Sequence, residues 1–165
     1  DENRDMFAIR GVPIHTAPGS GGSPPAVSTP ARRVLIVDDE PVFAKALVRE
    51  QGRRLQLPKD RFKIAANAEE ALGVYTGVVA GGAIFACVIT DMEMPTTDGG
   101  LSLYRNLRRA GYLGPVVFLS SNPDYGTKVK ALQDARVRFF SKPPDHDRIE
   151  SCLREMLSGT GGPGR

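Results

Sequence analysis

The chain has 165 residues, of which 41% are hydrophobic and 25% charged, the composition of an ordinary globular protein with one core. Its formal net charge of +3 is too small to indicate nucleic-acid binding by itself. Two cysteines, Cys87 and Cys152, lie in apolar patterns and are expected to be small buried hydrophobes, so no disulfide framework or cysteine metal site is indicated. The longest uncharged apolar stretch is about a dozen residues, short of the roughly 20 that cross a bilayer.

Composition divides the chain into three segments. Residues 1–31 contain the run APGSGGSPPAVSTP, which offers little to bury, and are predicted to be a flexible linker or tail. The apolar cluster MFAI at 6–9 is interpreted as the end of an upstream domain or as residues added for expression, with a short docking segment as the alternative. Residues 32–158 carry the strand and helix patterns of one domain, and residues 159–165 are predicted to be a second flexible tail.

The first predicted strand, VLIV at 34–37, ends in two adjacent carboxylates, Asp38 and Asp39. Like charges side by side repel, and a cation between them relieves the repulsion. Mg²⁺ prefers oxygen ligands and usually takes one or two carboxylates together with phosphate oxygens. The pair therefore predicts a Mg²⁺ site that draws further oxygen ligands from elsewhere in the chain.

Three later apolar runs also end in residues with chemical function. These runs and their end residues are 84–90 with Asp91, 115–119 with Ser120, and 137–141 with Lys142. In an open parallel α/β sheet the carboxyl ends of the strands converge on one crevice. These three side chains are therefore expected to meet Asp38 and Asp39 there.

Helical patterns lie between the strands. Residues 40–54, 71–75, 101–109, a segment starting at 122–124 and a segment starting at Asp145 are predicted helices, and 61–65 a short strand. Asn67 and Glu70 form a predicted capping box, whereas Pro95 and the glycine pair at 99–100 are predicted to form an exit loop. Five alternations of strand and helix indicate a flavodoxin-like, doubly wound sheet with five parallel strands in the order 2-1-3-4-5 and five helices.

Taken in chain order, the motifs DDE, TDMEMPTTDG, FLSS and FFSKPP resemble the receiver domain of two-component response regulators, over about residues 32–158. Each motif alone is weak, whereas their common order and their placement at strand ends are specific. The resemblance implies a phosphoacceptor that takes a phosphoryl group from a phosphohistidine partner and changes conformation to signal to an output domain or partner. It implies no enzyme activity beyond self-phosphorylation from a donor and autodephosphorylation.

The resemblance also assigns roles to single residues. Asp91 would be the phosphoacceptor, Lys142 would contact the acyl-phosphate oxygens as a point charge, and Ser120 would hydrogen-bond a phosphoryl oxygen. The implied Mg²⁺ ligands are Asp38 through a bound water, Asp39, Asp91 and the backbone carbonyl of Glu93.

The resemblance also implies one pair of residues for a conformational switch and another pair that sets the lifetime of the phosphate. Ser120 and Phe139 would form the conformational switch. Because Phe139 lacks the hydroxyl of the Tyr more familiar there, the switch would depend on packing alone, and a fixed core aromatic is the alternative. Glu93 and Asn122 would tune the lifetime of the phosphate, with an exposed loop carboxylate as the alternative for Glu93.

The sequence departs from the family pattern in two places. Residues 134–138 replace a Gly-bearing turn, so the face around the fourth helix and fifth strand is expected to be unusual. After Lys142 come two prolines, of which Pro143 matches the family's cis bond and Pro144 suits the start of a helix.

The implied partner is a histidine kinase or a histidine phosphotransfer protein, docking near the first helix, in the cytoplasm. A homodimer is compatible with the pattern, while no nucleic acid or membrane is expected to bind this domain. The linker favours a place in a hybrid kinase. Basic residues on and after the first helix form either a solvated face or a docking surface for an acidic helix: Lys45, Arg49, Arg53, Arg54, Lys59, Arg61 and Lys63.

Two alternatives remain at this stage. An Asp-nucleophile phosphohydrolase of the haloacid dehalogenase type uses similar residues, but its nucleophile follows the first motif strand and a second Asp stands two residues later. Here the acidic pair comes first and the residue two after Asp91 is Glu93. A binding-only pseudo-receiver is disfavoured because every required residue is present.

Overall fold

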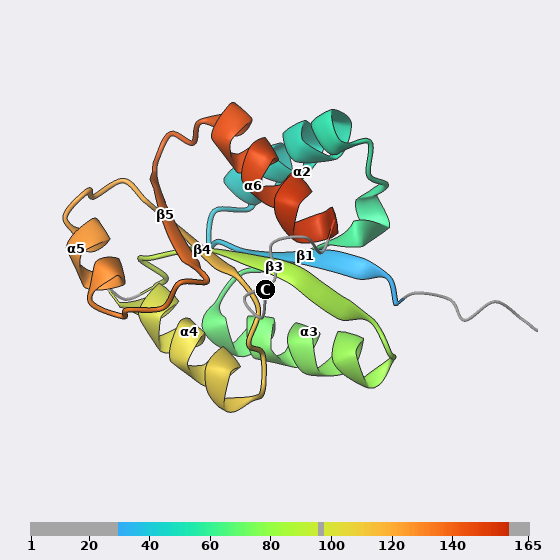
Figure 1. Cartoon of the computed structure of the whole chain (residues 1–165), viewed down its shortest axis with the longest axis horizontal. Coiled ribbons are helices and arrows are strands. Elements are labelled where there is room, and N and C mark those ends of the chain that lie inside the picture. The colour runs from blue at the N-terminus through green and yellow to red at the C-terminus, as the bar shows by residue number, and fades with distance from the viewer. Residues whose placement is uncertain (1–29, 96–97, 159–165) are drawn as a thin grey trace, which may run out of the picture.

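The computed structural model of the chain describes residues 30–95 and 98–158. One sheet contains five parallel strands in the order β2-β1-β3-β4-β5, as predicted (Figure 1). The strands are β1 (Arg32–Val37), β2 (Phe62–Ala65), β3 (Ile84–Asp91), β4 (Val116–Ser120) and β5 (Val137–Ser141). Most of the predicted N-terminal tail and all of the predicted C-terminal tail lie outside the described residues.

Helices cover both faces of the sheet. They are α2 (Pro41–Leu55), α3 (Ala68–Ala80), α4 (Gly99–Arg109), α5 (Tyr125–Lys130) and α6 (His146–Ser158), with a 3₁₀ turn η3 (Lys59–Arg61) before β2. In Figure 1, α2 and α6 lie above the sheet and α3 and α4 below it. Within the described ranges, no helix is long and apolar enough to cross a bilayer.

Side chains along each strand point alternately to the two faces of the sheet, so the core has two layers. Val34 and Ile36 of β1 pack in the cluster that contains α2 and α6 residues, whereas Leu35 and Val37 pack in the cluster with α3 and α4 residues. Successive strand side chains point to opposite faces, so a strand covered on both faces must be apolar throughout. This requirement explains the uninterrupted apolar runs of the sequence.

Local signals place the helix starts. The side chain of Asn67 accepts a hydrogen bond from the backbone N–H of Glu70 at 2.8 Å, and the Glu70 carboxylate accepts one from Ala66 at 3.2 Å. This pairing confirms the predicted cap, although Glu70 reaches one residue beyond the N-cap. At α6, Asp145 Oδ1 accepts the backbone N–H of Asp147 at 3.0 Å, as the predicted cap requires.

Asp134 explains one departure from the family pattern. Its Oδ2 accepts hydrogen bonds from the Tyr104 hydroxyl at 2.6 Å and Arg108 Nη2 at 3.0 Å, and its Oδ1 accepts the Arg136 N–H at 2.9 Å. The Arg108 guanidinium also lies 4.9 Å from the centre of the Tyr104 ring. The turn before β5 is thus tied to α4 by a side chain rather than shaped by a glycine.

Three sequence expectations need correction. The glycine pair is not in the exit loop, because α4 begins at Gly99. Strand β2 begins at Phe62, because Arg61 closes the 3₁₀ turn. Cys152 is half-buried rather than buried, while Cys87 is buried as expected.

Close backbone approach explains both glycines of α4. The N–H of Gly100 donates to the Met92 carbonyl at 2.8 Å. A Cβ on Gly100 would clash with the Asp91 carbonyl oxygen, and one on Gly99 with the Met94 carbonyl oxygen. Glycine is used here for space beside a folded backbone, which a sequence pattern does not distinguish from a turn.

We expect Gly100→Ala to lower the free energy of unfolding by about 1 to 3 kcal/mol, because backbone atoms must move to admit the methyl group. Urea denaturation measures this change. The matched control is Gly77→Ala in α3, where a Cβ meets nothing within 4 Å. The control should raise stability by about 0.4 to 1 kcal/mol, and equal effects at the two sites would contradict the packing argument.

Candidate functional site

Two buried carboxylates face one ammonium group at the carboxyl edge of the sheet. Asp38 follows β1 and Asp91 ends β3, and they are 2% and 8% exposed. Lys142 Nζ lies 2.9 Å from Asp38 Oδ2 and 3.5 Å from Asp91 Oδ1. The predicted convergence of these three residues is therefore present in the fold.

Two contacts besides its ion pairs hold Lys142. Its backbone N–H donates to the Ser120 carbonyl at 2.8 Å. The peptide bond to Pro143 is cis, as expected. Lys142 Nζ also lies 4.2 Å from the ring centre of Phe43, in the first turn of α2. Such an ammonium over an aromatic face is attracted by the ring quadrupole. Sequence reasoning placed Phe43 only on a helix face, because nothing in sequence spacing links α2 to the loop after β5.

An acidic cluster surrounds the end of β1. One carboxylate oxygen from each of Asp38, Asp39 and Glu40 lies within 4.8 Å of the others, and the last two residues are exposed. The Glu40 N–H also donates to Asp38 Oδ1 at 2.8 Å. Such an oxygen donor set fits a hard dication such as Mg²⁺. Glu40 was not among the predicted ligands, although its place in the DDE motif was a signal.

The Asp91 carboxyl group has an altered affinity for protons. Burial raises the pKa of Asp91 to about 6, and the nearby Asp38 charge acts in the same direction. Lys142 and the backbone N–H of Glu93, 3.4 Å from Asp91 Oδ1, oppose this shift. Burial alone would lower the pKa of Lys142, but its hydrogen bond with Asp38 and the two carboxylate charges raise that pKa. The lysine is therefore held in its charged form.

The predicted switch and lifetime residues lie on neighbouring segments. Ser120 ends β4, is 1% exposed, and its Oγ accepts the Asn122 N–H at 3.0 Å. Asn122 is exposed, and its Oδ1 accepts the Asp124 N–H at 3.0 Å. Phe139 of β5 is half-buried and lines a hollow beside Gly126 of α5.

We expect Asp91→Asn to stabilise the fold at about pH 7 in the absence of divalent cations. Because the pKa of Asp91 is raised in the folded chain, its stabilising contribution is fully present below the unfolded value of 3.8. It is lost as the pH rises through about 6. The neutral amide avoids that loss, so its advantage should grow by on the order of 1 to 3 kcal/mol between about pH 4 and pH 7.

Urea denaturation of both proteins in a chelator, across this pH range, measures the difference. An advantage that stays constant or shrinks as the pH rises would contradict the assigned environment of Asp91.

Comparisons with known proteins agree with this geometry. The family model described as the response regulator receiver domain matches residues 34–154. Response regulator Rre1 of Synechocystis sp. (strain ATCC 27184 / PCC 6803 / Kazusa) is 34% identical over 128 residues, which cover 76% of this chain and 51% of the relative. The osmosensing histidine protein kinase SLN1 of Saccharomyces cerevisiae is 25% identical over 131 residues, which cover 79% of this chain and 10% of that kinase.

A solved structure shares the fold. Chemotaxis response regulator CheY4 of Vibrio cholerae superposes with a TM-score of 0.57 and 23% identity, covering 78% of this chain and all of that one. The chain spans about half the length of Rre1 and a tenth of SLN1. Neither the phosphohydrolase nor the pseudo-receiver alternative gains support from these matches. Because the family model covers most of the chain and the sheet has the family's strand order, this chain belongs to the response regulator receiver domain family.

Proposed function

We propose that this receiver domain accepts a phosphoryl group on Asp91 from a phosphohistidine of a histidine kinase or histidine phosphotransfer protein, in the cytoplasm. The observation that carries the proposal is the position of Asp91 at the carboxyl edge, 3.5 Å from Lys142 and beside the acidic cluster. A carboxylate of this kind is a nucleophile, and the groups around it bind the charges of a phosphoryl group.

In the proposed transfer, an Asp91 oxygen attacks phosphorus in line with the phosphohistidine nitrogen. A P–O bond forms while the P–N bond breaks, and the released imidazole keeps the electron pair and takes a proton. Negative charge spreads over the equatorial phosphoryl oxygens. Lys142 neutralises part of that charge and needs little reorganisation, because Nζ is already 3.5 Å from Asp91 Oδ1.

The acidic cluster supports a Mg²⁺ requirement. As the resemblance implies, the residues that would hold the ion are Asp38 through a bound water, Asp39, Asp91 and the backbone carbonyl of Glu93. Of these, Asp38 and Asp39 lie in one acidic cluster with Glu40. When bound, Mg²⁺ supplies positive charge to the phosphoryl oxygens. Without it, Asp38 and Asp91 share a single ammonium group.

The proposed switch uses Ser120 and Phe139. A hydroxyl has one donor and two acceptor positions, so Ser120 Oγ can accept the Asn122 N–H and still donate to a phosphoryl oxygen. Movement of Ser120 toward the phosphate would free space beneath β4 for the Phe139 ring. The half-buried position of Phe139 beside Gly126 is compatible with such a rotation.

The phosphodonor is proposed to dock beside the first turn of α2. Val42 there is 82% exposed, and the next residue, Phe43, contacts Lys142. A partner covering Val42 would bring its phosphohistidine close to the carboxyl edge. Whether this domain sits in a separate regulator or in a hybrid kinase decides which donor is used.

We expect incubation of the full chain with Mg²⁺ and acetyl phosphate to add one phosphate, and Asp91→Asn to abolish the addition. Intact-mass spectrometry under mild conditions measures the product. The matched control, Asp98→Asn, changes an exposed carboxylate beyond the same loop and should leave the addition intact. Labelling of the Asp91→Asn protein at another residue would refute the assignment.

We expect Mg²⁺ to stabilise the fold, because it binds the folded carboxylate site and not the unfolded chain. The gain is about 2.7 kcal/mol at about 100-fold excess over the Kd. Asp39→Ala should remove the gain, whereas Asp60→Asn, an exposed carboxylate in η3, should retain it. A melting temperature that does not respond to Mg²⁺ in the parent protein would argue against a metal site.

We expect Glu93→Ala to lengthen the half-life of the phosphate several-fold without preventing phosphorylation. A proton acceptor beside an attacking water commonly contributes about 100-fold, and an exposed loop realises part of that. Glu93 suits this role better than Asn122, because a carboxylate can take a proton from the water whereas a neutral amide can only orient it. Intact-mass measurements at intervals after removal of the donor follow the loss of phosphate, and Glu155→Ala on α6 is the control variant. A shorter half-life in Glu93→Ala would show that repulsion between the Glu93 carboxylate and the phosphoryl group dominates.

A further inference from the structure

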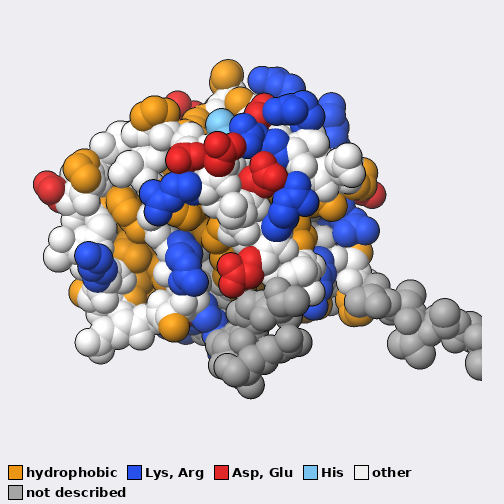
Figure 2. All heavy atoms as spheres, turned by 45° about the horizontal axis from the view of Figure 1, so that its top comes forward, with side chains coloured by type: hydrophobic (Ala, Val, Ile, Leu, Met, Phe, Trp, Pro, Cys, Tyr) orange, Lys and Arg blue, Asp and Glu red, His pale blue; other side chains and the backbone are white. Residues whose placement is uncertain are grey.

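Five of the seven basic residues on and after α2 fall into two groups. Arg54 binds three carboxylates, those of Glu50, Asp147 and Glu150, and Arg53 binds Glu50. No carboxylate of the described residues lies in ion-pair distance of the other group, which contains Lys45, Arg49 and Lys59. Figure 2 shows basic side chains gathered on the face that carries α2 and α6. The second group is therefore available for an acidic ligand.

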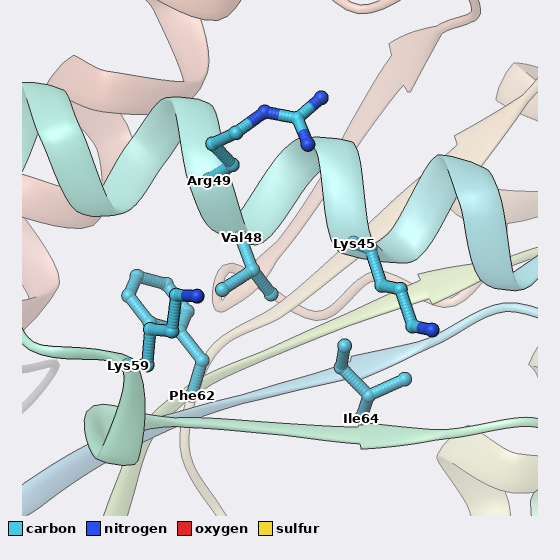
Figure 3. A pocket seen from close by; sticks show the side chains of 6 residues that line it. All are labelled: Lys45, Val48, Arg49, Lys59, Phe62 and Ile64. Carbon is cyan, nitrogen blue, oxygen red and sulfur yellow. The ribbon is translucent and has the colours of Figure 1, made fainter.

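These three residues border an apolar groove between α2 and β2, which we call the β2 groove. Its lining comprises the apolar side chains of Val48, Phe62 and Ile64 and the basic residues Lys45, Arg49 and Lys59, and its volume is about 400 Å³. Val48 projects from α2 toward the strand, while the Arg49 guanidinium extends away from the strand over α2 (Figure 3). Strand β2 is at the edge of the sheet, so no described strand covers its outer side. Ile64, on the face of β2 that carries Phe62, is 37% exposed.

One segment of the same chain has matching chemistry. Residues 1–9, DENRDMFAI, carry three carboxylate side chains against one arginine, followed by Met6, Phe7 and Ile9. Carboxylates would complement the basic residues of the groove, and apolar side chains would complement its apolar lining. The sequence alone left a docking role for residues 6–9 as an alternative, and the groove now supplies a matching surface.

The entry point of the chain permits this contact. Arg33 Nη1 donates to the Asp60 carbonyl at 3.1 Å, and Arg61 Nη1 donates to the Arg32 carbonyl at 3.5 Å. Strand β1 therefore starts beside η3, whose Lys59 borders the groove. About 20 residues separate Ile9 from β1, and a chain of that length spans up to about 70 Å, so residues 1–9 are within reach of the groove. Joining two binding partners in one chain raises their effective concentration to the order of millimolar. A weak contact would thus be populated within one chain.

We propose that the β2 groove binds residues 1–9 of its own chain, with carboxylates against Lys45, Arg49 and Lys59 and apolar side chains over Val48, Phe62 and Ile64. The proposal is independent of the phosphorylation chemistry. Two other occupants, a second copy of the chain and a separate acidic peptide, are distinguished by the test.

Paramagnetic relaxation enhancement tests the contact in the full 165-residue chain. A nitroxide is attached at Ala8→Cys in a Cys152→Ala background, because half-buried Cys152 would compete for the label while Cys87 is buried. Amides of Lys45, Val48 and Ile64 should lose intensity, and those of Gly73 and Gly77 on α3 should not.

Two variants test the chemistry. Lys45→Glu combined with Arg49→Glu should restore the groove signals. Lys63→Glu, on the opposite face of β2, should leave the loss unchanged, because neighbouring strand residues point to opposite faces. Equal loss at α3 and at the groove, or loss that persists in the double variant, would overturn the proposal.

A mixed sample separates occupation within one chain from occupation between chains. Spin-labelled protein without ¹⁵N is added to ¹⁵N protein without the label. Intensity loss in this sample would assign the groove to a second copy and overturn the proposal. Absence of loss in both samples would show that residues 1–9 do not occupy the groove and would overturn it as well.

Discussion

Two buried carboxylates sharing one ammonium group are the constraint on which the rest of this structure depends. Asp38 and Asp91 are 2% and 8% exposed, and Lys142 is the cation that contacts both. Removing an ion from water costs several kcal/mol even after relaxation, so each charge needs a partner. Burial raises the pKa of Asp91, and the neighbouring Asp38 charge adds to that shift. One lysine for two carboxylates also leaves an excess negative charge, which suits the edge to a dication.

The sheet order determines how the lysine reaches this position. Strand β4 lies between β3 and β5, so Lys142 must extend past the end of β4, where Ser120 lies. The Lys142 N–H is bonded to the Ser120 carbonyl, and its ammonium rests over Phe43 of α2. A phosphoryl group on Asp91 would compete with Asp38 for the same ammonium. Any shift of Lys142 would therefore change its contacts with β4, β5 and α2. These elements contain Ser120, Phe139 and Phe43.

The features that the sequence predicted correctly are the strands and the residues at their carboxyl ends, because both depend on local patterns. Largely apolar runs identified β1, β3, β4 and β5, and the residues at three of their ends, Asp38, Asp91 and Lys142, lie in contact as expected. Contacts between distant segments were not predictable: Phe43 beneath the lysine has no signature in sequence spacing. The glycine pair of α4 was misassigned, because a glycine needed for close approach to the Asp91 carbonyl looks the same as a glycine in a turn.

The basic residues around α2 look alike in the sequence, but in the fold some are neutralised by carboxylates and others are not. Arg54 is shared by Glu50, Asp147 and Glu150, and its hydrogen bond with Glu50, aided by Arg53, lowers the pKa of Glu50 to about 2. These pairs tie one flank of α2 to α6. The opposite flank, with Lys45 and Arg49, is left facing the β2 groove.

Helix α2 thus has different neighbours at its first turn and on its two flanks. Its first turn contacts the phosphorylation edge through Phe43, one flank is fixed to α6, and the other is open toward β2. Helix α2 is held to α6 by the ion pairs of Arg54 with Asp147 and Glu150, and by the shared apolar cluster that contains Leu47 and Leu153. A ligand in the groove would therefore contact the same packed helix whose first turn supports Lys142.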